Sequence, residues 1–145
     1  MKREIKLPER CTRFLIDSNL FIAAVKRGWT KSSELLSVLL DSSFELVANK
    51  ALLGEYENYA KELEAENILL YLNGRIIIID QSEEEVARCK PFFPVSQSSD
   101  VVHAATCLNA SAVLITNDRH FDKIRDSGLI RVWSISEAIK RLLEF

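Results

Sequence analysis

The sequence predicts an α/β fold with a mainly parallel sheet of about five strands. Three observations carry this prediction. Short apolar runs alternate along the chain with segments of helical spacing. The run Ile76–Ile79 is continuously apolar, which is typical of a strand covered by helices on both faces. The helix expected over 98–110 matches the strand expected over 112–116 in length, at about 1.5 Å and 3.3 Å per residue, so the two can pack antiparallel.

In the first half of the chain, the boundaries of the elements follow from residues that start or end helices. Ser18 or Asn19 caps the first helix, and Gly28 ends it. Asn49 caps a helix that carries apolar residues on one face as far as Leu63. The predicted elements are a strand over 12–17, a helix over 20–27, a leucine-rich helix beginning at Ser32 or Ser33 and reaching Leu40, a strand over 44–48, the helix from Asn49, and a helix over 64–72.

The second half repeats the alternation. Ser82 and Glu85 form a capping box at the start of a helix that Pro91 halts. After a loop over 94–97, the predicted elements are a helix over 98–110, a strand over 112–116, a turn with a short helix ending at Gly128, a strand over 130–135 and a helix over 136–145. Strands joined through helices in this way require right-handed crossovers.

Length and composition indicate an ordinary globular chain. With 145 residues, we expect one domain over 1–145, with residues 1–11 as a polar lead-in tail. The net charge of −2 gives no global signal for nucleic acid. Three cysteines without metal-type spacing are typical of reduced thiols, and no apolar run reaches the length of a signal or a membrane span. We therefore expect a cytoplasmic protein that does not enter a membrane.

Four carboxylates are expected to converge although they are far apart in sequence. Asp17 ends the first strand, Glu55 lies on the helix after the second, Asp100 opens the helix over 98–110, and Asp118 follows the strand over 112–116. A helix that packs back on its strand begins beside the end of that strand. All four acids therefore belong at the carboxyl edge of the parallel sheet, where ligands bind in such folds.

Each acid alone has a structural explanation. Asp17 can cap a helix, Asp100 can interact with a helix dipole, and Asp118 can stabilise a turn. Together, however, they repel each other unless a cation is present. Oxygen ligands of this kind suit Mg²⁺ or Mn²⁺, which can activate water for attack on phosphorus. The sequence therefore favours metal-dependent phosphodiester hydrolysis.

These residues resemble a known family, the PIN domains of VapC-type toxins and RNA-processing nucleases. The resemblance rests on four segments and covers roughly residues 12 to 136: Phe14-Leu15-Ile16-Asp17-Ser18-Asn19, Glu55, Ser99-Asp100-Val101-Val102-His103-Ala104-Ala105, and Thr116-Asn117-Asp118-Arg119-His120-Phe121. It implies a three-layer α/β/α sandwich, dependence on Mg²⁺ or Mn²⁺, and cleavage of single-stranded RNA. It also implies that Asp17, Glu55, Asp100 and Asp118 form the metal site.

One position departs from the family pattern. Family members often carry an acid where this chain has His120, which puts a metal contact from that position in question. Asp122 is a substitute candidate, although a solvated side chain is the simpler interpretation. His103, one turn after Asp100, is interpreted as a packed or surface histidine rather than as a ligand.

Other polar residues near the expected site are candidates for supporting roles. Asn19 and Thr116 are candidates to orient the acids by hydrogen bonds, and helix capping and turn formation explain them equally well. Asn117 and Arg119 lie beside the site, and Arg119 is a candidate phosphate contact.

Two other functions stay open. A receiver-like phosphoacceptor domain is suggested by Asp80 at the end of the third strand, although no lysine follows the last strand. A catalytically inert module that binds RNA or a partner is the other. A toxin would need an antitoxin protein as its partner. We also expect a homodimer, on the ground that the leucine-rich helix from Ser33 to Leu40 exposes apolar surface.

Overall fold

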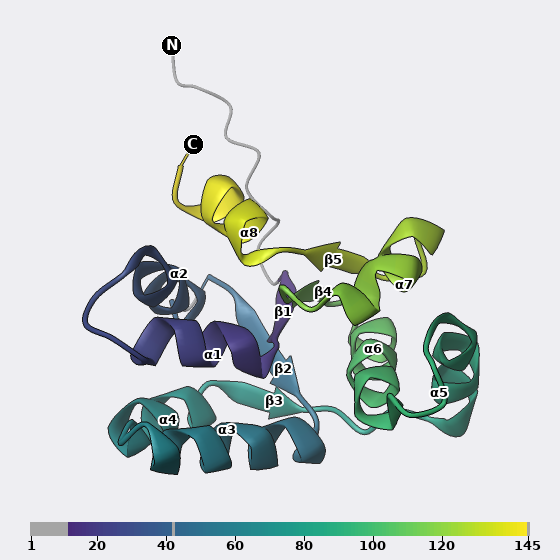
Figure 1. Cartoon of the computed structure of the whole chain (residues 1–145), viewed down its shortest axis with the longest axis horizontal. Coiled ribbons are helices and arrows are strands. Elements are labelled where there is room, and N and C mark those ends of the chain that lie inside the picture. Colours follow the sequence, from purple (N-terminus) through teal and green to yellow (C-terminus); the bar gives the residue numbers. More distant parts are fainter. Residues whose placement is uncertain (1–11, 42, 145) are drawn as a thin grey trace.

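The structure, a computed structural model, describes residues 12–41 and 43–144; the tail expected over 1–11 lies outside them. Its centre is a five-stranded sheet in the order β3-β2-β1-β4-β5, in which every pair of neighbours is parallel (Figure 1). The strands are β1 Arg13–Ile16, β2 Glu45–Ala48, β3 Ile76–Ile78, β4 Val113–Ile115 and β5 Arg131–Trp133. The predicted fold class is confirmed.

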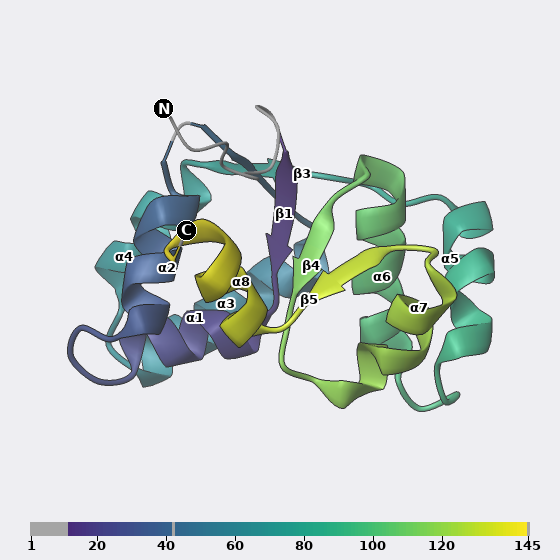
Figure 2. The same ribbon diagram turned by 90° about the horizontal axis from the view of Figure 1, so that it is seen from above.

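Helices cover both faces of the sheet, so the molecule has three layers. On one face lie α1 Ser18–Val25, α2 Lys31–Leu39, α3 Lys50–Glu62, α4 Glu66–Asn73 and α8 Ile135–Leu142 (Figure 1). On the other lie α5 Glu83–Cys89, α6 Ser98–Ala110 and α7 Asp122–Ser127 (Figure 2). Two single-turn helices, η1 Lys90–Phe92 and η2 Arg119–Phe121, complete the described elements. No helix in these described ranges combines the length and apolar character needed to cross a bilayer.

The order in which the chain adds strands to the sheet reverses at the two central strands, β1 and β4. From β1 the chain moves outward to β2 and β3, then returns through α5 and α6 to β4 on the other side of β1 and continues to β5. Right-handed crossovers place the connecting helices of the two halves on opposite faces, α1–α4 on one and α5–α7 on the other, as observed (Figures 1 and 2). The carboxyl ends of β1 and β4 therefore form the topological switch point of the sheet, where side chains from both halves meet.

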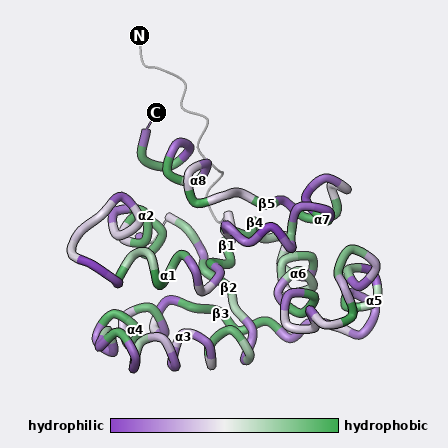
Figure 3. The backbone as a smooth tube through the Cα atoms, viewed as in Figure 1, coloured by the Kyte–Doolittle hydropathy of each residue, from purple (hydrophilic) through white to green (hydrophobic). Residues whose placement is uncertain are grey.

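The core is built around these two central strands. Phe14–Ile16 and Val113–Ile115 are at most 2% exposed, because neighbouring strands and helices enclose them on every side. Hydrophilic residues follow at once in the connection between β4 and α7 (Figure 3). The change from buried apolar strand to polar turn positions the functional side chains at the sheet edge.

Two predictions about apolar surface are wrong. β3 pairs only with β2, so Ile77 and Ile78 lie on an edge strand and are 40% and 41% exposed rather than covered. In α2, Leu35, Leu36 and Leu39 are buried because this helix packs against α1 and α8. These three leucines are therefore not the exposed apolar surface that was expected, and the homodimer stays a prediction.

Helix starts follow the expected chemistry, with two corrections. The capping box of Ser82 and Glu85 at α5 is confirmed, and Asn49 caps α3 by accepting from the Leu52 N–H. Asp17, not Ser18 or Asn19, caps α1. Thr30, rather than Ser32 or Ser33, caps α2, and Ser33 is its partner in the capping box.

A buried tyrosine links α3 to the end of β1. Tyr56 is fully buried, and its hydroxyl donates a hydrogen bond to the Ile16 carbonyl, next to Asp17. Tyr56→Phe keeps the ring but leaves this buried carbonyl without its partner, so we expect the free energy of unfolding to fall by about 1–3 kcal/mol. Tyr59→Phe, the same change at a half-buried position of α3, should cost less than about 0.5 kcal/mol. Equal losses in urea unfolding would contradict this assignment.

Candidate metal centre

The four predicted acids lie at the carboxyl edge of the sheet. Asp17 directly follows β1, and Asp118 follows β4, which pairs with β1 in register from Phe14 to Ile16. Asp100 is in the first turn of α6, and Glu55 is in the second turn of α3. Two clusters result, one of Asp17, Glu55 and His103 and one of Asp100, Asp118 and His120, and in each the possible ligand atoms lie within 4.8 Å of one another.

The Thr116 hydroxyl connects the ends of the two central strands. Its Oγ1 donates to Asp17 Oδ2 over 2.6 Å and accepts from Asn19 Nδ2 over 3.2 Å and from the Asp118 N–H over 3.0 Å. A hydroxyl has one proton and two lone pairs, so all its hydrogen-bonding capacity is used. Thr116 is 3% exposed, and it fixes the Asp17 side chain together with the start of the Asp118 turn.

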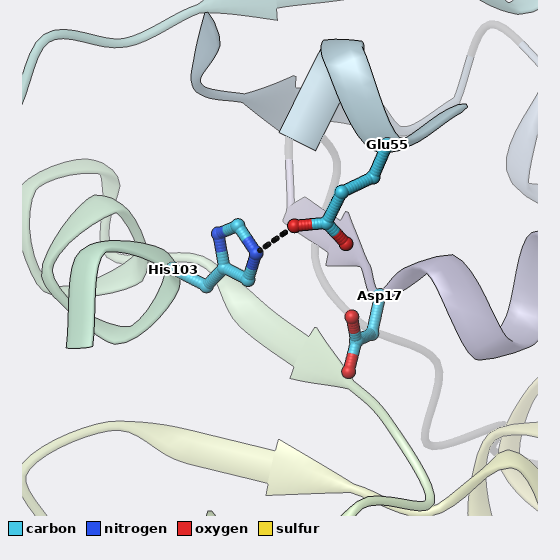
Figure 4. Close-up of side chains that lie close together, drawn as sticks. All are labelled: Asp17, Glu55 and His103. Carbon is cyan, nitrogen blue, oxygen red and sulfur yellow. Dashed lines mark hydrogen bonds and ion pairs between the residues drawn. The ribbon is translucent and has the colours of Figure 1, made fainter. Parts of the chain in front are cut away.

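Glu55 is held by a buried histidine, as Figure 4 shows. Its Oε2 is 3.1 Å from Nε2 of His103, whose Nδ1 is 3.1 Å from Nδ2 of Asn49. Asn49 Oδ1 accepts from the Leu52 N–H, which fixes the orientation of the amide and leaves only its NH₂ group to face the ring. Nδ1 must therefore accept and Nε2 must donate to Glu55. His103 is 2% exposed, as expected for a packed histidine, and it also positions Glu55.

His120 lies between the other two acids. Its Nδ1 is 3.2 Å from Asp100 Oδ2 and 3.1 Å from Asp118 Oδ1, and its side chain is 46% exposed. The backbone N–H of His120 also donates to Asp118 Oδ1, which caps η2. The residue that departs from the family pattern thus lies against both acids, although almost half of its side chain is exposed.

Burial and like charges raise the pKa values of two of the acids, whereas a hydrogen bond lowers that of a third. Burial raises the pKa of Asp17 above its ordinary value, against the lowering effect of the Thr116 hydrogen bond. The pKa of Asp100 is also raised, first by burial and then by the charges of Asp118 and Asp17. The hydrogen bond from His103 lowers the pKa of Glu55. The site therefore concentrates negative charge that the protein alone does not neutralise.

The donor set fits a hard divalent cation. Asp100 Oδ2 and Asn19 Oδ1 are buried and have no hydrogen-bond partner among the described residues. Unpaired buried oxygens are costly, and a cation would relieve that cost. Carboxylate and amide oxygens are the ligands that Mg²⁺ and Mn²⁺ prefer.

The remaining predicted residues divide into site and structural positions. Asn19 donates to Thr116 and lies 3.5 Å from Asp17 Oδ2, whereas Asn117 accepts from the Ile135 N–H and so holds the start of α8. Arg119 is exposed at the start of η2, beside Asp118. Asp122 pairs with Arg125 at 3.2 Å. Among the described residues, neither Asp122 nor Asp80 belongs to a metal-type cluster.

Sequence reasoning did not predict that His103 and Asn49 act together on Glu55. One signal was available: His103 lies one turn after Asp100 on α6 and therefore shares its face. Asn49 gave only the signal of a helix cap, because its contact with His103 spans 54 residues.

Similarity to known proteins identifies the family of the chain. A family model described as PIN domain matches residues 14–127. No curated protein sequence matches significantly. The structure is similar to that of VapBC2 from Rickettsia felis bound to a DNA fragment from their promoter, with a TM-score of 0.61, 16% identity, and coverage of 85% of this chain and 98% of the other. It is also similar to VapBC-1 from nontypeable Haemophilus influenzae, with a TM-score of 0.60, 20% identity, and coverage of 86% and 99%. Since the family model spans most of its length, the chain belongs to the PIN domain family.

Proposed function

We propose that this protein is a metal-dependent endoribonuclease that hydrolyses phosphodiester bonds of single-stranded RNA. The observation that carries the proposal is the convergence of Asp17, Asp100 and Asp118 from two halves of the fold at the switch point of the sheet. Membership of the PIN family supports nuclease chemistry. The choice of single-stranded RNA follows from the resemblance to VapC-type and RNA-processing nucleases.

In this proposal Asp17, Glu55, Asp100 and Asp118 hold Mg²⁺ or Mn²⁺. Such an ion lowers the pKa of a water nucleophile and stabilises charge that develops on the phosphoryl oxygens. Thr116 and Asn19 hold Asp17 in place, and His103 orients Glu55. Arg119, exposed beside Asp118, is positioned to contact a substrate phosphate.

We further propose that the protein is the toxin of a toxin–antitoxin pair. The two similar structures are VapBC assemblies. An apolar groove between α1, α2 and α4 offers a surface for an antitoxin segment or for the second copy of a homodimer, and its lining includes Trp29 and Tyr71, which are 73% and 62% exposed. Cys89 and Cys107 are free and buried, in keeping with a reducing cytoplasm.

The alternatives are less well supported. Asp80 is exposed and, in the part of the chain that the structure describes, belongs to neither acid cluster, so a receiver-like phosphoacceptor site lacks support. An inert module that binds RNA or a partner does not explain why desolvated, mutually repelling carboxylates are present. It does define an outcome of the cleavage experiment, namely RNA binding without turnover.

The cleavage experiment uses purified protein, single-stranded RNA and either Mg²⁺ or Mn²⁺. Asp17→Asn and Asp118→Asn should each lower the cleavage rate by at least about a hundredfold, because a lost metal ligand removes several kcal/mol of transition-state stabilisation. EDTA should abolish cleavage. Asp80→Asn, an acid outside the clusters, is the matched control and should retain wild-type activity. Unchanged cleavage in Asp17→Asn and Asp118→Asn would reject these residues as the site.

The stability of the metal-free protein gives an independent test of charge repulsion at the site. A raised pKa means that folded Asp100 holds its proton more tightly than the unfolded chain does, so ionisation of Asp100 at pH 7 destabilises the native state. Asp100→Asn should therefore raise the free energy of unfolding in EDTA by about 0.5–2 kcal/mol. The gain should disappear below the ordinary carboxyl range, where the group is protonated in both states.

Denaturant unfolding at pH 7, with and without Mg²⁺, measures this effect. Mg²⁺ should stabilise the wild type more than Asp100→Asn, because the variant has lost a ligand. Asp80→Asn, a change at an exposed acid, should stay within about 0.5 kcal/mol of wild type. A metal-free Asp100→Asn protein that is less stable than wild type would contradict the electrostatic account of the site.

A pair of variants tests the Thr116 hydroxyl. Thr116→Val removes its three hydrogen bonds at nearly constant volume and should lower both metal affinity and cleavage rate by about 10–100-fold. Thr116→Ser keeps the hydroxyl and should retain most of both. If the two variants behave alike, the methyl group rather than the hydroxyl is what matters at this position.

A further inference from the structure

We infer that His120 is a nitrogen ligand of the metal, so that the site selects a transition ion such as Mn²⁺ over Mg²⁺. This inference rests on the proposed function and specifies the metal at the same site. It starts from the cluster of Asp100, Asp118 and His120, the one part of the site in which this chain departs from the acids that its resemblance implies.

The spacing of the three atoms is that of neighbouring ligands. His120 Nδ1 lies 3.2 Å from Asp100 Oδ2 and 3.1 Å from Asp118 Oδ1. Two ligand atoms at right angles around an ion, each about 2.1 Å from it, are separated by about 3.0 Å. These two distances, with all three atoms within 4.8 Å of one another, suit ligands of one small shared ion.

The contacts do not amount to a saturated hydrogen-bond network. Asp100 Oδ2 has no hydrogen-bond partner although the ring nitrogen is 3.2 Å away, so their relative direction is unsuitable for a hydrogen bond. Asp118 Oδ1 takes its hydrogen bond from the backbone N–H of His120. The ring nitrogen and both oxygens thus lie within 4.8 Å of one another without a hydrogen bond from the ring nitrogen to Asp100 Oδ2, which leaves room for an ion among them.

The other histidine is not available for this role. Both ring nitrogens of His103 are engaged, Nδ1 with Asn49 and Nε2 with Glu55. His103 therefore acts on the metal through Glu55, as a positioning residue. The chain contains two histidines in all, so a nitrogen signal from bound imidazole has only these two sources.

An imidazole ligand changes which ions the site prefers. Mg²⁺ favours a shell of oxygens, whereas first-row transition ions accept imidazole nitrogen and bind N/O sites more tightly from Mn²⁺ towards Cu²⁺. With His120 in place of an acid, the site also has one negative charge fewer. This loss weakens the binding of Mg²⁺ more than that of Mn²⁺, because Mg²⁺ gives up its water ligands less readily. The expected result is tighter binding of Mn²⁺ than of Mg²⁺.

The test uses untagged full-length protein and measures metal binding directly. Calorimetry gives the affinities for Mn²⁺ and Mg²⁺, and pulsed electron paramagnetic resonance of bound Mn²⁺ detects coupling to ¹⁴N. The wild type should show this coupling. In His120→Gln the coupling should disappear and Mn²⁺ affinity should fall by at least about tenfold, with a smaller change for Mg²⁺. His120→Asp, which restores an oxygen ligand, should shift the preference back towards Mg²⁺.

His103→Gln is the matched control for the nitrogen source and should retain the coupling. Should this buried substitution fail to fold by circular dichroism, His103→Asn, which also removes the imidazole, takes its place and should likewise retain the coupling. Coupling that is absent from the wild type, that persists in His120→Gln, or that vanishes in His103→Gln would overturn the inference. Mn²⁺ binding in those cases would leave the proposed function standing, whereas no binding of either ion would overturn both.

Discussion

The site depends on a hydrogen bond between the ends of two adjacent strands. Thr116 and Asp17 are 99 residues apart in sequence, yet the hydroxyl of one donates to the carboxylate of the other over 2.6 Å inside the protein. This contact exists because β1 and β4 are parallel neighbours at the centre of the sheet, where the strand order reverses. The arrangement of Asn19 and the Asp118 turn around the same hydroxyl follows from it.

The fold holds together carboxylates that would separate in water. Asp17 and Asp100 are desolvated and feel each other's charge, and their positions are imposed by a core strand and by a helix packed on the sheet. Hydrogen bonds from Thr116 and Ser18 offset part of the cost at Asp17, while Asp100 Oδ2 accepts no hydrogen bond from the described residues and has His120 Nδ1 at 3.2 Å as its nearest ion-pair partner. Preorganisation of this kind spends stability to keep ligand atoms ready, as functional sites commonly do.

Local signals in the sequence predicted the features that depend on local chemistry. The helix over 98–110 was predicted with its observed bounds, and the four acids were expected at the sheet edge because strand ends and helix starts meet there. Strand order carries no such signal. A run of isoleucines is equally apolar in a central and in an edge strand, so the exposure of Ile77 and Ile78 became evident only when β3 was seen to have one neighbour. The His103 network likewise joins residues about 50 positions apart, each with an adequate local explanation.

Asn49 serves both the fold and the proposed site, and this double role has a consequence for the mutations that would inactivate the protein. The same amide caps α3 and fixes the ring that holds Glu55, so helix start and ligand orientation share one side chain. Under the proposed function, a random screen for inactive alleles should therefore recover Asn49 together with the acids, because its loss would release the ring that holds Glu55. Alleles at this codon would mimic active-site lesions from a position behind the site.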